Sequence, residues 1–238
     1  EQLAERCHDE GNNPVILEGR CYEQESVPFK ALDSLIDSLA MFLGRMSKTA
    51  AQKLMPDDSP ALTRLFPVLG QFQTGSTRRA DLSLLNADQQ EIRQRAITAL
   101  RELLSRIGEQ RPLVLYIDDL QWGDADSATL LAELVRPPEP PKLLLIGSFR
   151  AENVGINEPL RRLDEEFAKG EPPPHRQDLA VESLSEDESR QLATMLLGEN
   201  LEPEQREQLA ARIAQESGGW PFFVWELAQH VREDVELS

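Results

Sequence analysis

The feature that most constrains this chain is an unbroken apolar run, Leu113 to Ile117, that ends in the carboxylate pair Asp118 and Asp119. A run without polar alternation is typical of a strand buried on both faces, as in a parallel sheet covered by helices. A second apolar run spans 142–148 and a shorter one spans 15–17. Helical patterns separate the runs, so the sequence predicts an α/β fold with a parallel sheet.

Apolar spacing, capping residues and prolines predict the other elements. We expect a helix tail at 1–10, helices at 29–43, 86–107, 127–136, 158–168, 186–197, 203–216 and 222–233, short helices within 44–85, and a weaker strand at 176–181. Asp126 and Ser127 are the expected cap of the helix at 127–136, and Ser185 with Glu188 fits a capping box. The domain prediction is an α/β core at 1–182 with a large helical insert at 29–110, followed by a helical lid subdomain at 183–238.

The charge balance excludes some classes of function. The chain has 42 acidic and 25 basic side chains and a formal net charge of −17. Nucleic-acid surfaces need clustered Lys and Arg, and an anionic membrane repels an acidic chain, so we expect neither partner. No apolar run reaches the roughly 20 residues of a transmembrane helix. Cys7 and Cys21 show no metal-site spacing, so a reduced, cytoplasmic protein is the default expectation.

The carboxylate pair predicts a magnesium site. At the carboxyl end of a parallel strand, Asp118 and Asp119 lie where open α/β sheets bind ligands. One carboxylate can hold Mg²⁺, and the other can orient a water for attack on a phosphate. Arg150 follows the next apolar run, so we expect it beside them, where a guanidinium can sense a terminal phosphate. The alternatives are two aspartates that merely solvate a strand end and an arginine that lies on the surface or pairs with them.

A phosphate-binding loop of the pattern G-x-x-x-x-G-K-[ST] is absent from the sequence. Gly70 to Thr77 has the glycine spacing and the final hydroxyl, but Ser76 stands at the lysine position. This segment also follows a proline-broken helical stretch rather than a strand. We interpret it as a coincidental match in a polar loop.

Four segments, in chain order, resemble AAA-type ATPase modules of the STAND class of signalling NTPases. Leu113 to Leu131, centred on Asp-Asp-Leu-Gln-Trp-Gly-Asp at 118–124, is similar to their Walker B region. The segment 17–32 is closest to modules fused to bacterial serine/threonine protein kinases; related modules occur in adenylate cyclases and large transcription regulators. Gly147 to Arg150 is similar to the sensor strand, and Gly219 to Phe223 to the Gly-x-Pro segment of the helical subdomain. The resemblance implies a P-loop NTPase fold of the ASCE type.

The resemblance also implies a role for each matching residue. Asp118 would hold Mg²⁺ through water, and Asp119 would polarise the attacking water. Arg150 would read the γ-phosphate of ATP, and Pro221 would lie against the adenine. The family has a first strand and a Lys-bearing P-loop before the helix tail at 1–10, so the resemblance implies a fragment that binds ATP weakly or not at all.

The missing strand would leave a sheet edge open beside 143–148. An open edge is prone to pair with another strand, so we expect the strand at 176–181 or a strand from a second copy to occupy it. The second possibility predicts a homo-oligomer.

Two functions fit these residues. In the first, the parent protein binds and slowly hydrolyses ATP, and the nucleotide state switches an attached effector, such as a serine/threonine protein kinase or a regulator. In the second, the ATPase fold is a scaffold without hydrolysis, and the insert at 29–110 binds a partner protein. A third interpretation, an unrelated flavodoxin-like domain, does not account for the four ordered segments.

Overall fold

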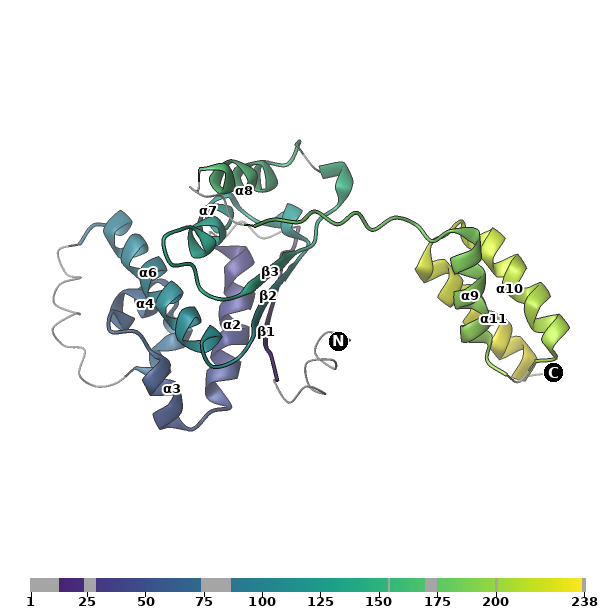
Figure 1. Ribbon diagram of the computed structural model, residues 1–238, viewed down its shortest axis with the longest axis horizontal. Helices are drawn as coiled ribbons and strands as arrows, with labels where there is room; N and C mark the ends of the chain where they lie inside the picture. Colours follow the sequence, from purple (N-terminus) through teal and green to yellow (C-terminus); the bar gives the residue numbers. More distant parts are fainter. Residues whose placement is uncertain are drawn as a thin grey trace. The chain divides into compact units, whose positions relative to one another are not determined.

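A computed structural model of the protein describes residues 13–23, 29–73, 87–153, 155–169, 175–199 and 201–236. The chain divides into two units, Glu1–Arg176 and Gln177–Ser238, and each is described by itself (Figure 1). The division falls a few residues before the boundary expected between 182 and 183. The helix tail expected at 1–10, which includes Cys7, lies outside the described residues.

A parallel sheet lies at the centre of the first unit and confirms the α/β prediction. Its described strands lie in the order β1 (Val15–Arg20), β2 (Leu113–Asp118) and β3 (Leu144–Gly147). Both neighbouring pairs are parallel. The central strand is β2, and four of its six residues are buried, as an unbroken apolar run predicts. All three strands therefore end at the same edge of the sheet.

Two strand predictions are wrong in part. The run at 142–148 forms β3, but it is not a buried strand: Leu144 is 49% exposed and Ile146 is 37% exposed. Within the described residues, β3 has a neighbouring strand on one side only, so part of its apolar surface stays in contact with water. The first strand continues to Arg20 instead of ending at Leu17, because β2 offers hydrogen-bonding partners along that whole length.

The strand expected at 176–181 does not form. This segment is described and contains no strand, and Leu179 and Val181 are 78% and 91% exposed. A strand needs a neighbour to satisfy its backbone groups, and the described strands of the sheet are β1, β2 and β3. It therefore does not occupy the edge beside β3.

The outer edge of β1 is closed by a helix, α2 (Lys30–Gly44). The Glu18 N–H donates to Ser38 Oγ at 3.2 Å, and the Arg20 N–H donates to Ser34 Oγ at 2.9 Å. The two serines are one helical turn apart and so lie on the same face of α2. Donors that a further strand would use are thus satisfied by side chains, which protects this edge.

The remaining helices of the first unit follow the predicted order (Figure 1). They are α3 (Lys48–Leu54), α4 (Ser59–Leu65), η1 (Pro67–Phe72), α6 (Gln89–Gly108), η2 (Leu120–Trp122), α7 (Ala125–Val135), η3 (Ala151–Asn153) and α8 (Glu158–Ala168), where η marks a 3-10 helix. The long helices α2, α6 and α8 confirm their predictions. The cap of α7 is Asp124, whose side chain accepts the Ser127 N–H, so the expected cap at Asp126 is wrong. Gly70 lies within η1, and residues 74–86 are outside the described part of the chain.

One hydrophobic core joins the sheet to the expected insert. Its fully buried side chains come from β1, β2, α2 and α6, and they include Leu17, Leu32, Leu39, Leu100, Leu103, Leu115 and Ile117. Arg95 adds an ion pair within this unit: its Nε and Nη2 donate to the two carboxylate oxygens of Asp58 at 2.7 and 2.9 Å. The helices between β1 and β2 therefore pack as part of the same unit as the sheet.

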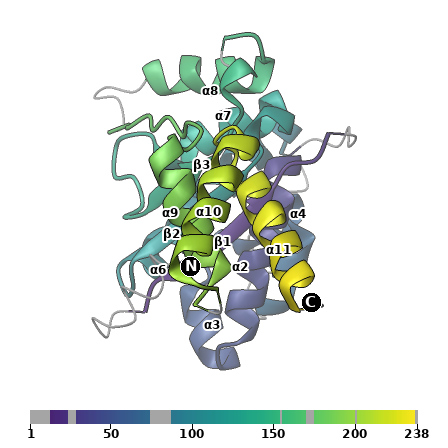
Figure 2. The ribbon, with the colours of Figure 1, turned by 90° about the vertical axis from the view of Figure 1, so that its right-hand side faces the viewer.

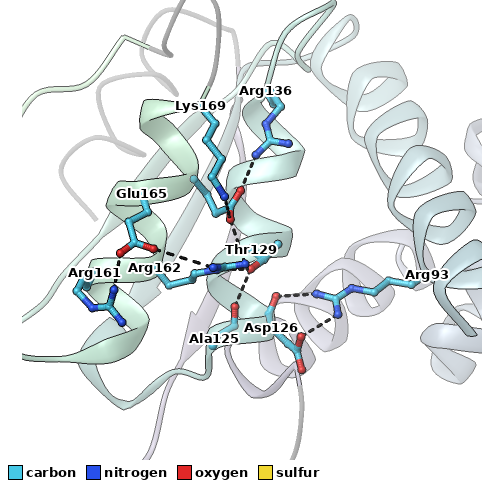
Figure 3. A network of polar contacts seen from close by, with 10 residues as sticks. Arg93, Ala125, Asp126, Thr129, Arg136, Arg161, Arg162, Glu165 and Lys169 are labelled. Atoms are coloured by element: carbon cyan, nitrogen blue, oxygen red, sulfur yellow. Dashed lines mark hydrogen bonds and ion pairs between the residues drawn. The ribbon is translucent and has the colours of Figure 1, made fainter.

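A buried carboxylate fastens α8 to the end of α7. Glu166 is 5% exposed and accepts from Arg136 Nη2 at 2.8 Å and Lys169 Nζ at 2.6 Å. Arg162 Nη2 lies 3.2 Å from the same carboxylate, and Figure 3 shows Arg136, Arg162 and Lys169 in this network. The Lys169 hydrogen bond, with the other cations, holds the pKa of Glu166 below its ordinary value.

The second unit is a three-helix array of α9 (Glu186–Leu197), α10 (Pro203–Ser217) and α11 (Pro221–Glu236), which pack side by side (Figure 2). All three helices confirm their predictions, and so does the capping box at Ser185 and Glu188. Gly219 adopts a φ of 82°, and its carbonyl accepts the Leu184 N–H at 2.8 Å. A Cβ at Gly219 would lie 2.4 Å from the Leu184 carbonyl oxygen, so this close approach requires glycine.

No helix within the described residues of either unit is long and apolar enough to cross a membrane.

Candidate functional site

The carboxylate pair sits where β2 ends and the chain turns. Asp118 is the last residue of β2, and Asp119 has a left-handed backbone with φ 57° and ψ 42°. This conformation costs a residue other than glycine about 1 kcal/mol, and such residues are often found at functional sites. The turn leads directly into η2, which brings Gln121 back toward Asp119.

Asp118 is held by two hydroxyl groups, one from β2 and one from the residue that follows β3. Its Oδ1 accepts from the Tyr116 hydroxyl at 3.0 Å and from the Ser148 hydroxyl. The Ser148 oxygen also accepts the Asp119 N–H at 3.1 Å, so the residue after β3 contacts both aspartates. The Ser148 hydrogen bond is the main reason that the pKa of Asp118 lies below its ordinary value. Asp118 is therefore a carboxylate at neutral pH, as a cation ligand must be.

Asp119 is held by two nitrogen donors. Its Oδ2 accepts from Arg20 Nη2 at 3.0 Å, and its Oδ1 accepts from Gln121 Nε2 at 2.9 Å. Arg20 also lies near Asp118, with 3.7 Å between Nε and Oδ2. The hydrogen bond that Arg20 donates to Asp119 raises the pKa of Arg20 further above its already high value. The Arg20 side chain is 56% exposed, whereas Gln121 is 2% exposed.

Arg20 and Gln121 are the site residues that sequence reasoning missed. The apolar run ends at Leu17, so the sequence pattern leaves Arg20 outside the expected strand. The parallel register places Arg20 opposite Asp118, so a longer strand would have revealed it. Gln121 is close to Asp119 in the sequence, but nothing in the pattern indicates that its amide is buried.

Arg150 does not supply the guanidinium at the carboxylate pair. Its N–H donates to Gln121 Oε1 at 3.3 Å, and its side chain is exposed. Among the described ion pairs, the arginine bound to Asp118 and Asp119 is Arg20. The described ion pairs do not include the alternative in which Arg150 pairs with these carboxylates, and the expected role of Arg150 toward a phosphate stays a prediction.

Pro221 belongs to the second unit, where it is the first residue of α11. Its sequence neighbours Trp220 and Phe222 are both 63% exposed, so exposed aromatic side chains flank Pro221 along the chain. Because the second unit is described by itself, the contact of Pro221 with an adenine stays a prediction.

The site can provide oxygen ligands for a hard cation. The described residues contain no group of three or more His, Cys, Asp or Glu side chains that could hold a metal. Mg²⁺ is commonly bound through one or two carboxylates together with waters and substrate phosphates. Asp118 and Asp119 therefore fit an ion that arrives with a phosphate compound better than a permanently held metal.

Comparison with known proteins assigns the first unit to a family. Residues 1–146 match the family model of the AAA ATPase domain, and this match includes β1, β2 and both aspartates. Arg150 and the second unit lie beyond the matched residues. No curated protein and no solved structure matches the chain. Since the family model covers more than half of the sequence, the chain belongs to the AAA ATPase domain family, and this membership supports a nucleotide-binding ATPase function.

Proposed function

We propose that the chain is part of a cytoplasmic signalling ATPase of the STAND class, in which bound ATP and its slow hydrolysis switch an attached effector. A serine/threonine protein kinase or a regulator is the proposed effector. The observation that carries the proposal is the carboxylate pair at the end of β2, within a sequence of the AAA ATPase domain family. Ligands of open α/β sheets bind at this edge.

Each carboxylate has a separate task in this proposal. Asp118 is ionised and would hold Mg²⁺, which neutralises phosphate charge when it is bound with ATP. Asp119 would orient the attacking water through a carboxylate oxygen. Its Oδ1 is held by the buried Gln121, and its Oδ2 is held by the exposed Arg20. The water would therefore replace Arg20 at Oδ2, since an exposed side chain moves at lower cost than a buried one.

The test replaces one carboxylate by its neutral isostere. Because the 238 residues contain no lysine-bearing phosphate loop, the test uses the full-length parent protein. Asp119→Asn should abolish phosphate release while ATP binding, measured by calorimetry with Mg²⁺, stays within about threefold of wild type. Asp126→Asn is the matched control, because this aspartate pairs with Arg93 away from the strand end. Normal turnover in Asp119→Asn would remove the proposed role of Asp119.

Two further residues are assigned by the same proposal. Arg150→Ala should reduce the preference for ATP over ADP, because its guanidinium would contact the γ-phosphate. Arg161→Ala is the control, since Arg161 is also an exposed arginine but pairs with Glu165 on α8. Pro221 would contact the adenine, so Pro221→Ala should weaken binding of ATP and ADP equally.

A scaffold without hydrolysis is the second candidate function. The observation in its favour is that the carboxylate oxygens are already engaged by Arg20, Gln121, Tyr116 and Ser148. Structural ion-pair networks produce the same pattern. The two candidates differ in the coding sequence upstream of Glu1: a G-x-x-G-x-G-K-[ST] segment there supports the ATPase, and its absence supports the scaffold.

A further inference from the structure

The buried amide of Gln121 joins two parts of the candidate site that are far apart in the sequence. Its Nε2 donates to Asp119 Oδ1 at 2.9 Å, and its Oε1 accepts the Arg150 N–H at 3.3 Å. The residue is 2% exposed. A hydrogen bond shielded from water in this way is stronger than an exposed one, so Gln121 can hold Asp119 and the Arg150 backbone in fixed relative positions.

The amide can connect these groups in one orientation only. A carboxylate at neutral pH accepts hydrogen bonds, so the Nε2 end must face Asp119. A backbone N–H only donates, so the Oε1 end must face Arg150. Methionine would lose both bonds, and asparagine is one methylene too short to span the two groups.

The backbone that carries Gln121 is fixed from two sides. The Leu120 N–H donates to the Ser148 carbonyl at 2.9 Å, and Asn157 Nδ2 donates to the Gln121 carbonyl at 2.7 Å. Gly147 also leaves room for this turn, because a Cβ there would lie 2.2 Å from Leu120 Cδ1. Because this backbone is held in place, the Gln121 side chain moves with Asp119 and Arg150 and not with a mobile loop.

We infer that Gln121 is a positioning residue that couples the Asp119 carboxylate to the main chain at Arg150. The inference rests on the proposed function, in which Asp119 orients water and Arg150 meets the γ-phosphate. A shift of the Arg150 backbone on contact with a phosphate moves the amide and thereby the carboxylate. Gln121 also fixes which oxygen of Asp119, Oδ2, is left for the water.

The first test needs no nucleotide and uses the 238-residue chain. Amide hydrogen exchange at Arg150 should become about tenfold faster in Gln121→Met, which removes the acceptor. It should stay unchanged in Gln121→Glu, which keeps an acceptor oxygen. Gln73→Met is the matched control, because this partly buried amide donates to Ser59 and Thr63 among the helices between β1 and β2. Unchanged exchange in Gln121→Met would overturn the Arg150 half of the inference.

The second test measures ATP turnover of the full-length protein with Mg²⁺. Gln121→Met should lower kcat about 10- to 100-fold, because it removes the donor to Asp119. KM should stay within about threefold, since a positioning residue acts on the reacting geometry. Gln73→Met should leave both constants unchanged. Wild-type kcat in Gln121→Met would overturn the Asp119 half.

A third measurement separates this inference from the proposed function. Asp119→Asn should shift the NMR resonance of the Arg150 amide in the wild-type background and leave it unmoved in the Gln121→Met background. If the full-length protein hydrolyses no ATP, the proposed function fails, but this comparison still decides the coupling. An equal shift in both backgrounds would show that Gln121 does not carry it.

Discussion

Removing the charge of Glu166 should destabilise the first unit, and the structure sets the size of the effect. Glu166→Gln keeps the side-chain shape but leaves Arg136, Arg162 and Lys169 without their shared counter-charge. The Glu166 side chain is 6% exposed, whereas those of the three cations are 31%, 42% and 56% exposed. Breaking a fully buried pair costs about 3–5 kcal/mol, and exposed pairs contribute about 0–1 kcal/mol each. For this mixed network we expect a loss of about 2–3 kcal/mol.

The matched control is the neighbouring residue on α8. Glu165 is 43% exposed and pairs with Arg161 and Arg162, so Glu165→Gln should cost under about 1 kcal/mol. Urea unfolding of both variants, followed by far-UV circular dichroism near pH 7, gives the two free energies. Equal values for Glu166→Gln and Glu165→Gln would refute the argument that burial of the carboxylate determines the effect.

The pH dependence provides a second check on the same carboxylate. The pKa of Glu166 is lower in the folded protein than its ordinary value of 4.5, so folding favours its ionised form. Its stabilisation is therefore complete above the unfolded pKa and is lost as the pH falls through the folded pKa. The difference between wild type and Glu166→Gln should be constant above about pH 6 and shrink below about pH 4. A difference that persists undiminished in acid would contradict the assignment to ionised Glu166.

Three further predictions concern other parts of the chain. Gly219→Ala should destabilise the second unit by about 1–3 kcal/mol in thermal unfolding, because the new Cβ would meet the Leu184 carbonyl. The control is Gly155→Ala: Gly155 has a φ of 76° and open space around it, so the substitution should cost about 1 kcal/mol. Arg20→Ala should strengthen Mg²⁺ binding several-fold in calorimetry, since the carboxylates lose a competing cation; unchanged affinity would argue against a shared site. If the open edge of β3 supports a homo-oligomer, Ile146→Lys should give monomers in sedimentation velocity at concentrations where the wild type associates.

The sequence predicts those elements whose signal is local. The strand β2 and the helix α6 can both be recognised in the sequence. Burial on both faces gives β2 an unbroken apolar run, and burial of one face gives α6 apolar residues at helical spacing. The capping box of α9 is equally local, since both partners lie within one turn. At the start of α7, Asp124 and Asp126 are equally suitable cap residues, and only the backbone geometry selects the first.

Elements whose stability comes from distant partners could not be predicted in this way. The polar end of β1 looks like a loop because Glu18 and Arg20 gain their partners from α2 and β2. The candidate site has the same character. Asp118 and Asp119 follow from an apolar strand with an acidic end, but the pairing with Arg20 depends on strand register. Gln121 depends on the left-handed turn at Asp119, which the sequence does not reveal.

The hydrogen bonds from β1 to Ser34 and Ser38 affect where a further strand can join the sheet. With Ser34 and Ser38 accepting two of the outward N–H groups of β1, the described sheet is more open to a new strand alongside β3. Such a strand would lie next to Gly147 and the segment that carries Ser148, whose hydroxyl holds Asp118. We expect a strand recruited at that edge to influence, through Ser148, the position of the aspartate that would hold the cation.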